Sequence, residues 1–179
     1  MSRAEAKRRR LQSLLGSAAS AISLTVEQLM TGSPITVEPH TSALDLGQLF
    51  YTLHIRHFPV KDETGRLVGI VSDREMVRCF GVGREPTEEE LARVSVRQLM
   101  NTDVLAVEPH VPVLEAVRLM LRYGVSSLPV TRDGQLVGIV TSSDLFALLE
   151  RLLTVAQPAA PSGAEIEAGW TTPAPAPLG

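Results

Sequence analysis

The chain contains the run Leu67-Val68-Gly69-Ile70-Val71-Ser72-Asp73-Arg74-Glu75 and, further on, the run Leu136-Val137-Gly138-Ile139-Val140-Thr141-Ser142-Ser143-Asp144. The first five residues of the two runs are identical. In both runs a hydroxyl side chain follows, Ser72 or Thr141, and a carboxylate stands three positions later, Glu75 or Asp144. Five consecutive identities indicate an internal duplication.

The duplication extends toward the N-terminus at an offset of 70 residues, from Thr25–Met30 to Ser95–Met100. In each copy a hydroxyl residue is followed three positions later by Gln, which is the spacing of a capping box and predicts a short helix. The same offset carries Val37-Glu38-Pro39-His40 onto Val107-Glu108-Pro109-His110, and Pro59-Val60 onto Pro129-Val130. The five-residue match lies at offset 69, so one residue has been lost between Val130 and Leu136, where a turn tolerates the loss.

Each copy predicts the order strand, helix, strand, strand, helix. A short strand is expected at 35–37. The following helix carries apolar residues at i, i+3, i+4 and i+7, which we interpret as core positions. They are Leu46, Leu49, Phe50 and Leu53 in the first copy, and Ala116, Leu119, Met120 and Tyr123 in the second.

The second half of each copy predicts a hairpin and a closing helix. Strands are expected at 58–60 and 67–71, and Asp133-Gly134 is a strong hairpin signal in the second copy. The closing helices are expected to start near Asp73 and near Ser142. One copy has a thin core and would be marginal alone, so we predict an α+β fold in which two copies pack together.

This organisation divides the chain into five parts: a basic segment at 1–23, the first module at 24–81, a linker at 82–93, the second module at 94–153 and an Ala/Pro-rich tail at 154–179. The linker holds Thr87-Glu88-Glu89-Glu90, which is expected to cap a helical turn. The tail, which contains Trp170, is expected to be disordered.

The basic segment has two interpretations. Lys7 to Arg10 precede an apolar pattern typical of an amphipathic helix. Such a helix could meet an anionic membrane surface or a partner. The interpretation we favour is a solvated basic arm leading into a helix that covers the domain.

The composition narrows the class of protein. With 44% hydrophobic and 21% charged residues, it is that of an ordinary soluble globular protein. The formal net charge of −3 argues against nucleic-acid binding by the whole chain. No apolar run is long enough to cross a bilayer, and no signal peptide is recognisable, so we expect a cytoplasmic protein. The single cysteine, Cys79, is expected to be a buried thiol.

At this level of detail the duplicated module resembles the CBS (cystathionine-β-synthase) domain, and the tandem pair resembles a Bateman module. The resemblance rests on Leu-Met before a loop, on Val-Glu-Pro, on Phe58-Pro59-Val60 with Leu128-Pro129-Val130, and on Val-Gly-Ile-Val followed by Ser or Thr. It implies two modules about a pseudo-twofold axis, with two clefts between them. It also implies adenosine-containing ligands such as AMP, ADP, ATP or S-adenosylmethionine, and association of two pairs into a homodimer.

The resemblance also implies binding residues. In the second copy Thr141 and Asp144 match the family's Thr-x-x-Asp, with the carboxylate for the ribose hydroxyls and the helix start for phosphate. Backbone near Leu105, Val125 and Ser126 would hold the adenine, and Ile35 is counted among the ligand-binding residues.

The first copy departs from this pattern, because Ser72 and Glu75 stand where the second has Thr141 and Asp144. Asp73 could substitute for Glu75, or could serve only as a helix N-cap. Arg56 and His57 could face a phosphate. These differences allow a mixed site, with ribose contacts from one copy and phosphate contacts from the other.

Other interpretations stay open. Thr141 and Asp144 could do no more than cap the closing helix. A metal site at His54 and His57 is not favoured, because no cysteine or second pair of ligands lies nearby. No nucleophile and base form a recognisable set, so we expect no catalysis. The prediction is a regulatory nucleotide-binding module, and the alternative is a ligand-free dimerising scaffold.

Overall fold

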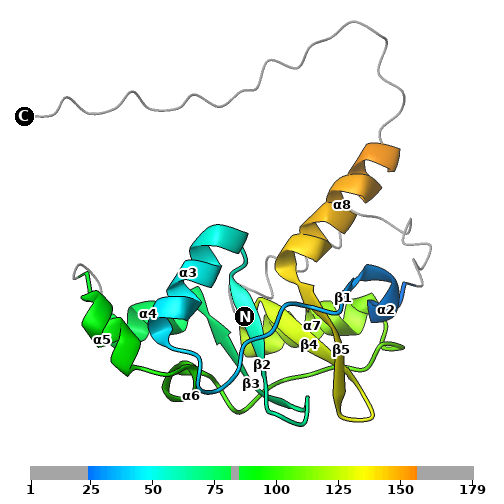
Figure 1. The fold of residues 1–179 in the computed structure, drawn as a ribbon. Helices are drawn as coiled ribbons and strands as arrows, with labels where there is room; N and C mark the ends of the chain where they lie inside the picture. Colours follow the sequence, from blue (N-terminus) through cyan, green and yellow to red (C-terminus); the bar gives the residue numbers. More distant parts are fainter. Residues whose placement is uncertain (1–23, 82–84, 157–179) are drawn as a thin grey trace, which may run out of the picture. The chain divides into compact units, whose positions relative to one another are not determined.

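A computed structural model describes residues 24–81 and 85–156 (Figure 1). The basic segment at 1–23, residues 82–84 and the tail from 157, with Trp170, lie outside the described residues. The chain divides into two units after Leu145, and the first holds both copies of the module up to that residue. The helices are α2 (Val26–Leu29), α3 (Ala43–Leu53), α4 (Asp73–Phe80), α5 (Glu88–Arg93), α6 (Val96–Leu99), α7 (Val113–Tyr123) and α8 (Ser142–Ala156). The strands are β1 (Thr31–Gly32), β2 (His57–Lys61), β3 (Leu67–Ser72), β4 (Ser127–Arg132) and β5 (Gln135–Thr141).

Both predicted hairpins are confirmed. Strands β2 and β3 pair antiparallel with His57 opposite Ser72, and β4 and β5 pair with Ser127 opposite Thr141. Asp133 and Gly134 both have positive φ, 52° and 77°. Two consecutive residues of positive φ are the geometry of the tight turn that matches strand twist, which is why Asp-Gly was informative there.

The predicted strand at 35–37 is wrong. Val37 makes only an isolated parallel bridge to Val60, and Val107 makes the equivalent bridge to Val130. Extending the first ladder back to Ile35 would require an N–H from residue 59, which is Pro59 and has none. Proline therefore leaves the backbone of Ile35 outside the sheet, and Pro129 does the same for Leu105.

The cores form on the helix faces that the periodicity predicted, except at their last positions. Leu46 and Ala116 are fully buried, and Leu49, Phe50, Leu119 and Met120 pack around them. The prediction is wrong for Leu53, which is 38% exposed, and for Tyr123, which is 59% exposed. Both residues end their helices next to a residue in the left-handed conformation, His54 or Gly124, where the chain turns away from the core.

The two copies exchange their first helices. Both capping boxes are present, so the short helices α2 and α6 are confirmed. However, Val26 of α2 belongs to the core built on α7, and Val96 of α6 belongs to the core built on α3. Strand β1 follows α2 and pairs with β5 of the second copy, and Figure 1 shows α2 and β1 beside β5. Each core is therefore completed by the other copy.

Helix α4 corrects the prediction for Cys79, which is exposed. None of the eight residues of α4 is fully buried. Met76 and Phe80, one turn apart, pack against the core, and Cys79 lies outside that contact. The expected cap of the linker helix is confirmed, because Thr87 caps α5. The N-cap of α4 is Ser72 and not Asp73. Helix α8 runs to Ala156, three residues into the predicted tail. Within the described residues no helix combines the length and the apolar character that crossing a membrane requires.

Candidate functional site

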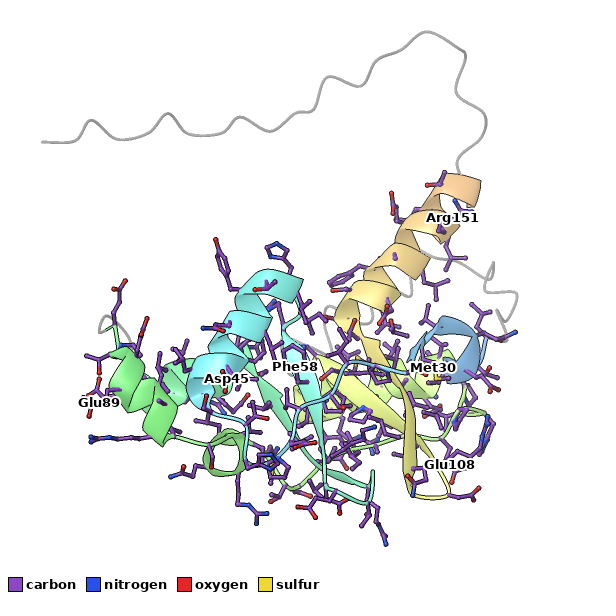
Figure 2. The ribbon with its side chains drawn as sticks, viewed as in Figure 1. Met30, Asp45, Phe58, Glu89, Glu108 and Arg151 are labelled. Atoms are coloured by element: carbon purple, nitrogen blue, oxygen red, sulfur yellow. The ribbon has the colours of Figure 1, made fainter. Side chains whose placement is uncertain are left out.

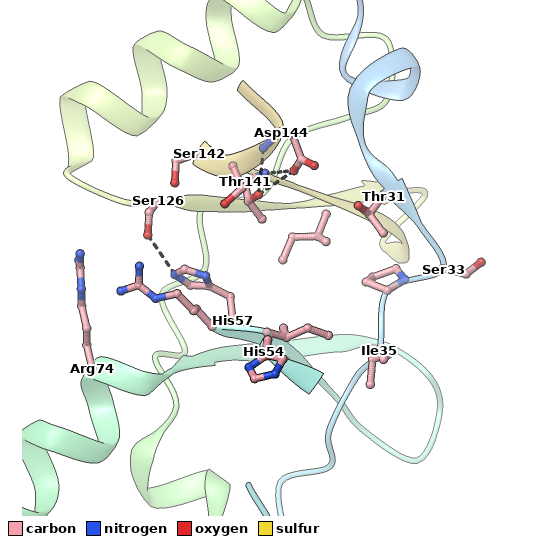
Figure 3. Close-up of a pocket in the computed structure, with 15 residues that line it drawn as sticks. Thr31, Ser33, Ile35, His54, His57, Arg74, Ser126, Thr141, Ser142 and Asp144 are labelled. Carbon is pink, nitrogen blue, oxygen red and sulfur yellow. Dashed lines mark hydrogen bonds between the residues drawn. The ribbon is translucent and has the colours of Figure 1, made fainter. Parts of the chain in front are cut away.

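Two clefts lie between the copies, and the first is a cavity of about 430 Å³. That volume lies within the range of small-molecule sites. Its lining residues come from both copies: Thr31, Ser33, Pro34, Ile35, His54, Ile55, Arg56, His57 and Arg74 from the first, and Ser126, Ile139, Thr141, Ser142, Ser143 and Asp144 from the second. We call it cleft 1. Figure 3 shows Thr141, Ser142 and Asp144 on one wall and His54 and His57 on the other.

The wall formed by α8 carries a capping box. Asp144 Oδ2 accepts hydrogen bonds from the backbone N–H and the hydroxyl of Thr141, both at 2.7 Å. The capping interpretation of this pair is therefore confirmed. Capping occupies one carboxylate oxygen, and Oδ1 has no hydrogen-bond partner among residues 24–81 and 85–156. Asp144 can cap the helix and still accept a hydrogen bond from a ligand.

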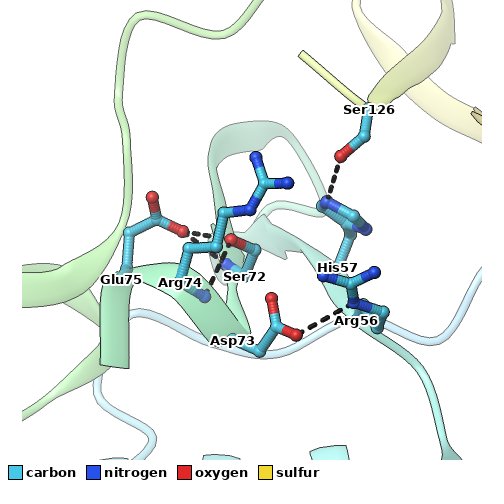
Figure 4. A network of polar contacts seen from close by, with 7 residues as sticks. All are labelled: Arg56, His57, Ser72, Asp73, Arg74, Glu75 and Ser126. Carbon is cyan, nitrogen blue, oxygen red and sulfur yellow. Dashed lines mark hydrogen bonds and ion pairs between the residues drawn. The ribbon is translucent and has the colours of Figure 1, made fainter. Parts of the chain in front are cut away.

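The opposite wall is cationic. Arg56 and Arg74 line cleft 1, where Asp144 is the single carboxylate among the lining residues. The guanidinium Nε of Arg56 lies 2.9 Å from Asp73 Oδ2, as Figure 4 shows. The second oxygen, Asp73 Oδ1, is buried without a hydrogen-bond partner in the described part of the chain. A buried oxygen without a hydrogen-bond partner destabilises the folded state. This cost offsets part of the stabilisation that the ion pair between Asp73 and Arg56 provides.

His57 stands between the copies, with its Nε2 3.0 Å from the hydroxyl of Ser126. Burial lowers the pKa of His57 below its ordinary value; nearby Arg56 and Arg74 act in the same direction, while Asp73 and Glu75 oppose them. The imidazole is therefore largely neutral at pH 7. An anion in the cleft would favour its protonated form.

The second cleft, cleft 2, is a cavity of about 270 Å³. It is lined by His57, Ile70, Val71, Ser72, Arg74, Glu75, Arg78, Asn101, Asp103, Val104, Leu105, Tyr123, Gly124, Val125, Ser126, Ser127 and Pro129. These positions largely repeat those of cleft 1 at the offset of the duplication, with the roles of the two copies exchanged. Two arginines here face two carboxylates, so cleft 2 has the more balanced charge.

Glu75 differs from Asp144 because both of its oxygens are engaged. Oε2 accepts from the backbone N–H of Ser72 at 2.9 Å and from the Ser72 hydroxyl, and Oε1 lies 3.4 Å from Arg78. Asp103 is the other carboxylate of cleft 2. The longer side chain of Glu75 closes the capping box and also reaches Arg78, which leaves it less available to a ligand.

The structure distributes the residues predicted from the sequence over both clefts. Cleft 1 brings together Ile35, Arg56, His57, Ser126, Thr141 and Asp144, and cleft 2 brings together His57, Ser72, Glu75, Leu105, Val125 and Ser126. The grouping of Leu105 and Val125 with Thr141 and Asp144 is wrong, because the exchange of segments between the copies separates them. Asp73 lines neither cleft and is not the N-cap of α4, which is Ser72.

Sequence reasoning missed several lining residues, among them Ser33, His54 and Arg74 in cleft 1 and Asn101 and Asp103 in cleft 2. The duplication offset could have found most of them, because Ser33 corresponds to Asp103 and Ile35 to Leu105. Arg74 could not be found in that way, since the second copy has Ser143 in its place. Among the described residues no group of three or more metal-binding side chains is placed to hold an ion.

The family profile of the CBS domain matches residues 26–81 and again residues 96–151. The chain belongs to the CBS-domain family. Its fold is a tandem CBS pair. A CBS domain-containing protein of Dictyostelium discoideum is 34% identical over 140 residues, which cover 74% of this chain and 96% of that protein.

Two solved CBS structures that resemble this chain contain ligands. The CBS domain pair of protein MJ0100, in complex with 5′-methylthioadenosine and S-adenosyl-L-methionine, has a TM-score of 0.61 and 26% identity, covering 70% of this chain and 99% of that one. CBSX2 in complex with AMP has a TM-score of 0.63 and 26% identity, covering 72% and 98%. CBS pairs similar to this one therefore bind adenosine-containing ligands.

Some relatives are larger enzymes that match this chain over a minor part of their length. The L-aspartate semialdehyde sulfurtransferase of Methanocaldococcus jannaschii is 28% identical over 124 residues, which are 69% of this chain and 23% of the enzyme. For the A-adding tRNA nucleotidyltransferase of Aquifex aeolicus the match covers 14% of the enzyme. In this chain the family match consists of the two CBS modules.

Proposed function

We propose that this chain is a regulatory module that binds an adenosine-containing nucleotide in cleft 1. The observation that carries the proposal is the free oxygen of Asp144 on one wall of a cavity whose other wall holds Arg56, His57 and Arg74. A carboxylate oxygen accepts hydrogen bonds from ribose hydroxyls, and the two arginines suit a phosphate group. The sugar and the phosphate would thus be held by different copies.

The adenine has a place beside these groups. Ile35 lines cleft 1, and its backbone makes no hydrogen bond to another residue that the structure describes. Its N–H and C=O are free to pair with the edge of a base, and Ile55 and Ile139 supply apolar surface for the ring. The ligands carried by MJ0100 and CBSX2, which are adenosine compounds, support this assignment.

Regulation would follow from differential affinity. The cleft is built from both copies, so a ligand that joins its two walls favours one arrangement of the copies over others. The shift is limited by the difference in affinity for the two arrangements. A partner that reads this arrangement, assembly into a homodimer, a cytoplasmic location and the lack of catalysis stay predictions.

Thermal unfolding with AMP, ADP, ATP and S-adenosylmethionine tests the proposal. A ligand present at about 100 times its Kd stabilises the folded state by about 2.7 kcal/mol, which corresponds to a rise in Tm of roughly 5–10 °C for a chain of this size. No rise with any of the four compounds would refute it.

A second function, a ligand-free scaffold, is favoured by one observation. The capping boxes of Thr141 with Asp144 and of Ser72 with Glu75 give these residues a structural role without a ligand. A stable homodimer whose Tm none of the four compounds changes would establish this alternative.

A further inference from the structure

The two clefts share one wall. His57, Arg74 and Ser126 line both cavities, from strand β2, helix α4 and the residue before strand β4. Figure 4 shows these three residues close to the polar side chains at the start of α4. A charge placed on this wall therefore acts on both clefts.

Arg74 is a cation of this wall whose guanidinium makes no ion pair within the described part of the chain. Arg56 is held by Asp73, and Arg78 is paired with Glu75. The guanidinium of Arg74 has no ion pair or hydrogen bond with any residue that the structure describes. Figure 4 shows its side chain extending toward Ser126 and not toward Asp73. It can turn to either cleft without breaking a bond.

We infer that Arg74 is a phosphate-binding residue for both clefts and serves one at a time, so that phosphate-bearing ligands in the two clefts bind antagonistically. The inference rests on the proposed function of cleft 1. A phosphate in cleft 1 draws Arg74 to that side and places negative charge next to the shared wall. Cleft 2 is left with Arg78, which is tied to Glu75, and with the carboxylate of Asp103.

The consequence is a division of ligand classes. While cleft 1 holds a nucleotide, cleft 2 disfavours a second phosphate and accepts an uncharged nucleoside more readily. By linkage, the antagonism between two phosphate ligands is reciprocal. Coupling between binding sites is typically about 5- to 150-fold in affinity, and we expect a value near the lower end because Arg74 is exposed and its charge is screened.

Amide NMR of the ¹⁵N-labelled full chain separates the two clefts, because Ile35 lines only cleft 1 and Asp103 lines only cleft 2. ATP is titrated into the wild type and into Asp144→Asn, in which cleft 1 is weakened. The Kd of ATP for cleft 2 is followed at Asp103. It should be at least about five-fold larger in the wild type, where cleft 1 is filled, than in the variant, where cleft 1 is empty. We call the quotient of these two Kd values the Kd ratio. The same comparison with adenosine should give a Kd ratio near one.

Two substitutions on the same helix complete the test. When Arg74→Gln is introduced into both the wild type and Asp144→Asn, the Kd ratio for ATP should fall to near one. The matched control, Arg78→Gln, removes a cation that lines only cleft 2. It should lower the affinity of cleft 2 for ATP but leave the Kd ratio unchanged. Dispersed amide spectra establish that each variant is folded.

The outcomes separate the two proposals. The absence of a shift at Ile35 would refute the proposed function, and the inference with it. Binding at Ile35 together with an ATP ratio near one, or with no ATP binding at Asp103 in Asp144→Asn, would overturn only the inference. A ratio that survives Arg74→Gln would also overturn it, because the coupling would then not depend on that residue.

Discussion

His57 Nε2 lies 3.0 Å from the hydroxyl of Ser126, and this contact joins the two copies of the module across the wall between their clefts. The offset of the duplication makes Ser126 the counterpart of Arg56. The copies have therefore diverged at corresponding positions, toward cations in the first and hydroxyls in the second. The cationic segment serves cleft 1, which is the reason that we assign the phosphate there.

The first prediction concerns the carboxylate of Asp144. Asp144→Asn keeps an oxygen for the helix cap but removes the charge that a pair of ribose hydroxyls favours. We expect the rise in Tm with ATP to be reduced to the part that binding in cleft 2 supplies, with little change in the Tm of the ligand-free protein. Glu75→Gln, the corresponding change in the first copy, is the matched control and should keep the rise. Thermal melts of both variants with and without ATP measure this, and an undiminished rise in Asp144→Asn would contradict the prediction.

The second prediction concerns the ion pair between Arg56 and Asp73. Asp73 competes with a ligand phosphate for Arg56, so Asp73→Asn should raise the affinity of cleft 1 for ATP. An exposed ion pair contributes about 0.2–1 kcal/mol, which corresponds to an increase of up to about five-fold. Calorimetric titration measures it. Glu89→Gln, which breaks an exposed pair with Arg93 on α5, should leave the affinity unchanged.

The third prediction concerns pH. The pKa of His57 is lowered in the ligand-free protein, chiefly by burial, and a bound phosphate would raise it. Binding then takes up a proton, so affinity for ATP should increase as the pH falls from 7.5 to 6, by about two- to ten-fold relative to His57→Gln. The other charged groups near His57 are Arg56, Arg74, Asp73 and Glu75.

The His57→Gln variant also serves as the control for pH. It experiences the same titration of the ATP phosphate, so the difference between the two proteins isolates the imidazole. The stability of the ligand-free protein should change with pH in the opposite direction. Because the pKa of His57 is lower in the folded chain than in the unfolded chain, the unfolded chain binds the proton more readily. The contribution of His57 to stability should therefore be lost as the pH falls below about 6.5. Equal pH profiles for the two proteins would contradict the prediction.

The fourth prediction concerns the exchange of segments between the copies. A Cβ on Gly138 would overlap Met30 Sδ and would lie 3.2 Å from the backbone oxygen of Thr31. Gly138→Ala should therefore destabilise the fold by about 1–3 kcal/mol. In Gly32→Ala the added Cβ meets nothing within 4 Å, so that variant should be close to neutral.

A double variant attributes the destabilisation to this contact. If Met30 is the obstacle, Gly138→Ala should cost less in a Met30→Ala background than in the wild type. Urea unfolding of the four proteins measures the difference. Strict additivity would show that the added methyl group does not meet Met30.

Much of the secondary structure followed from local signals. The hairpins, the capping boxes and the closing helices depend on residues within a few positions of each other, such as Asp133 with Gly134 or Ser72 with Glu75. The errors occurred where a distant residue decides. Ile35 is excluded from a strand by Pro59 on the neighbouring segment, and Cys79 is exposed because only Met76 and Phe80 of its helix reach the core.

The sequence by itself determined that one module is written twice, that each copy closes on a helix with a hydroxyl and a carboxylate, and that the pair resembles CBS domains. Repetition and capping are properties of residues near one another along the chain. Only the tertiary structure decided which residues share a cleft, because the copies exchange their first helices and following loops. Ile35 and Arg56 thereby meet Asp144 of the other copy, and Arg74 stands where both clefts can use it.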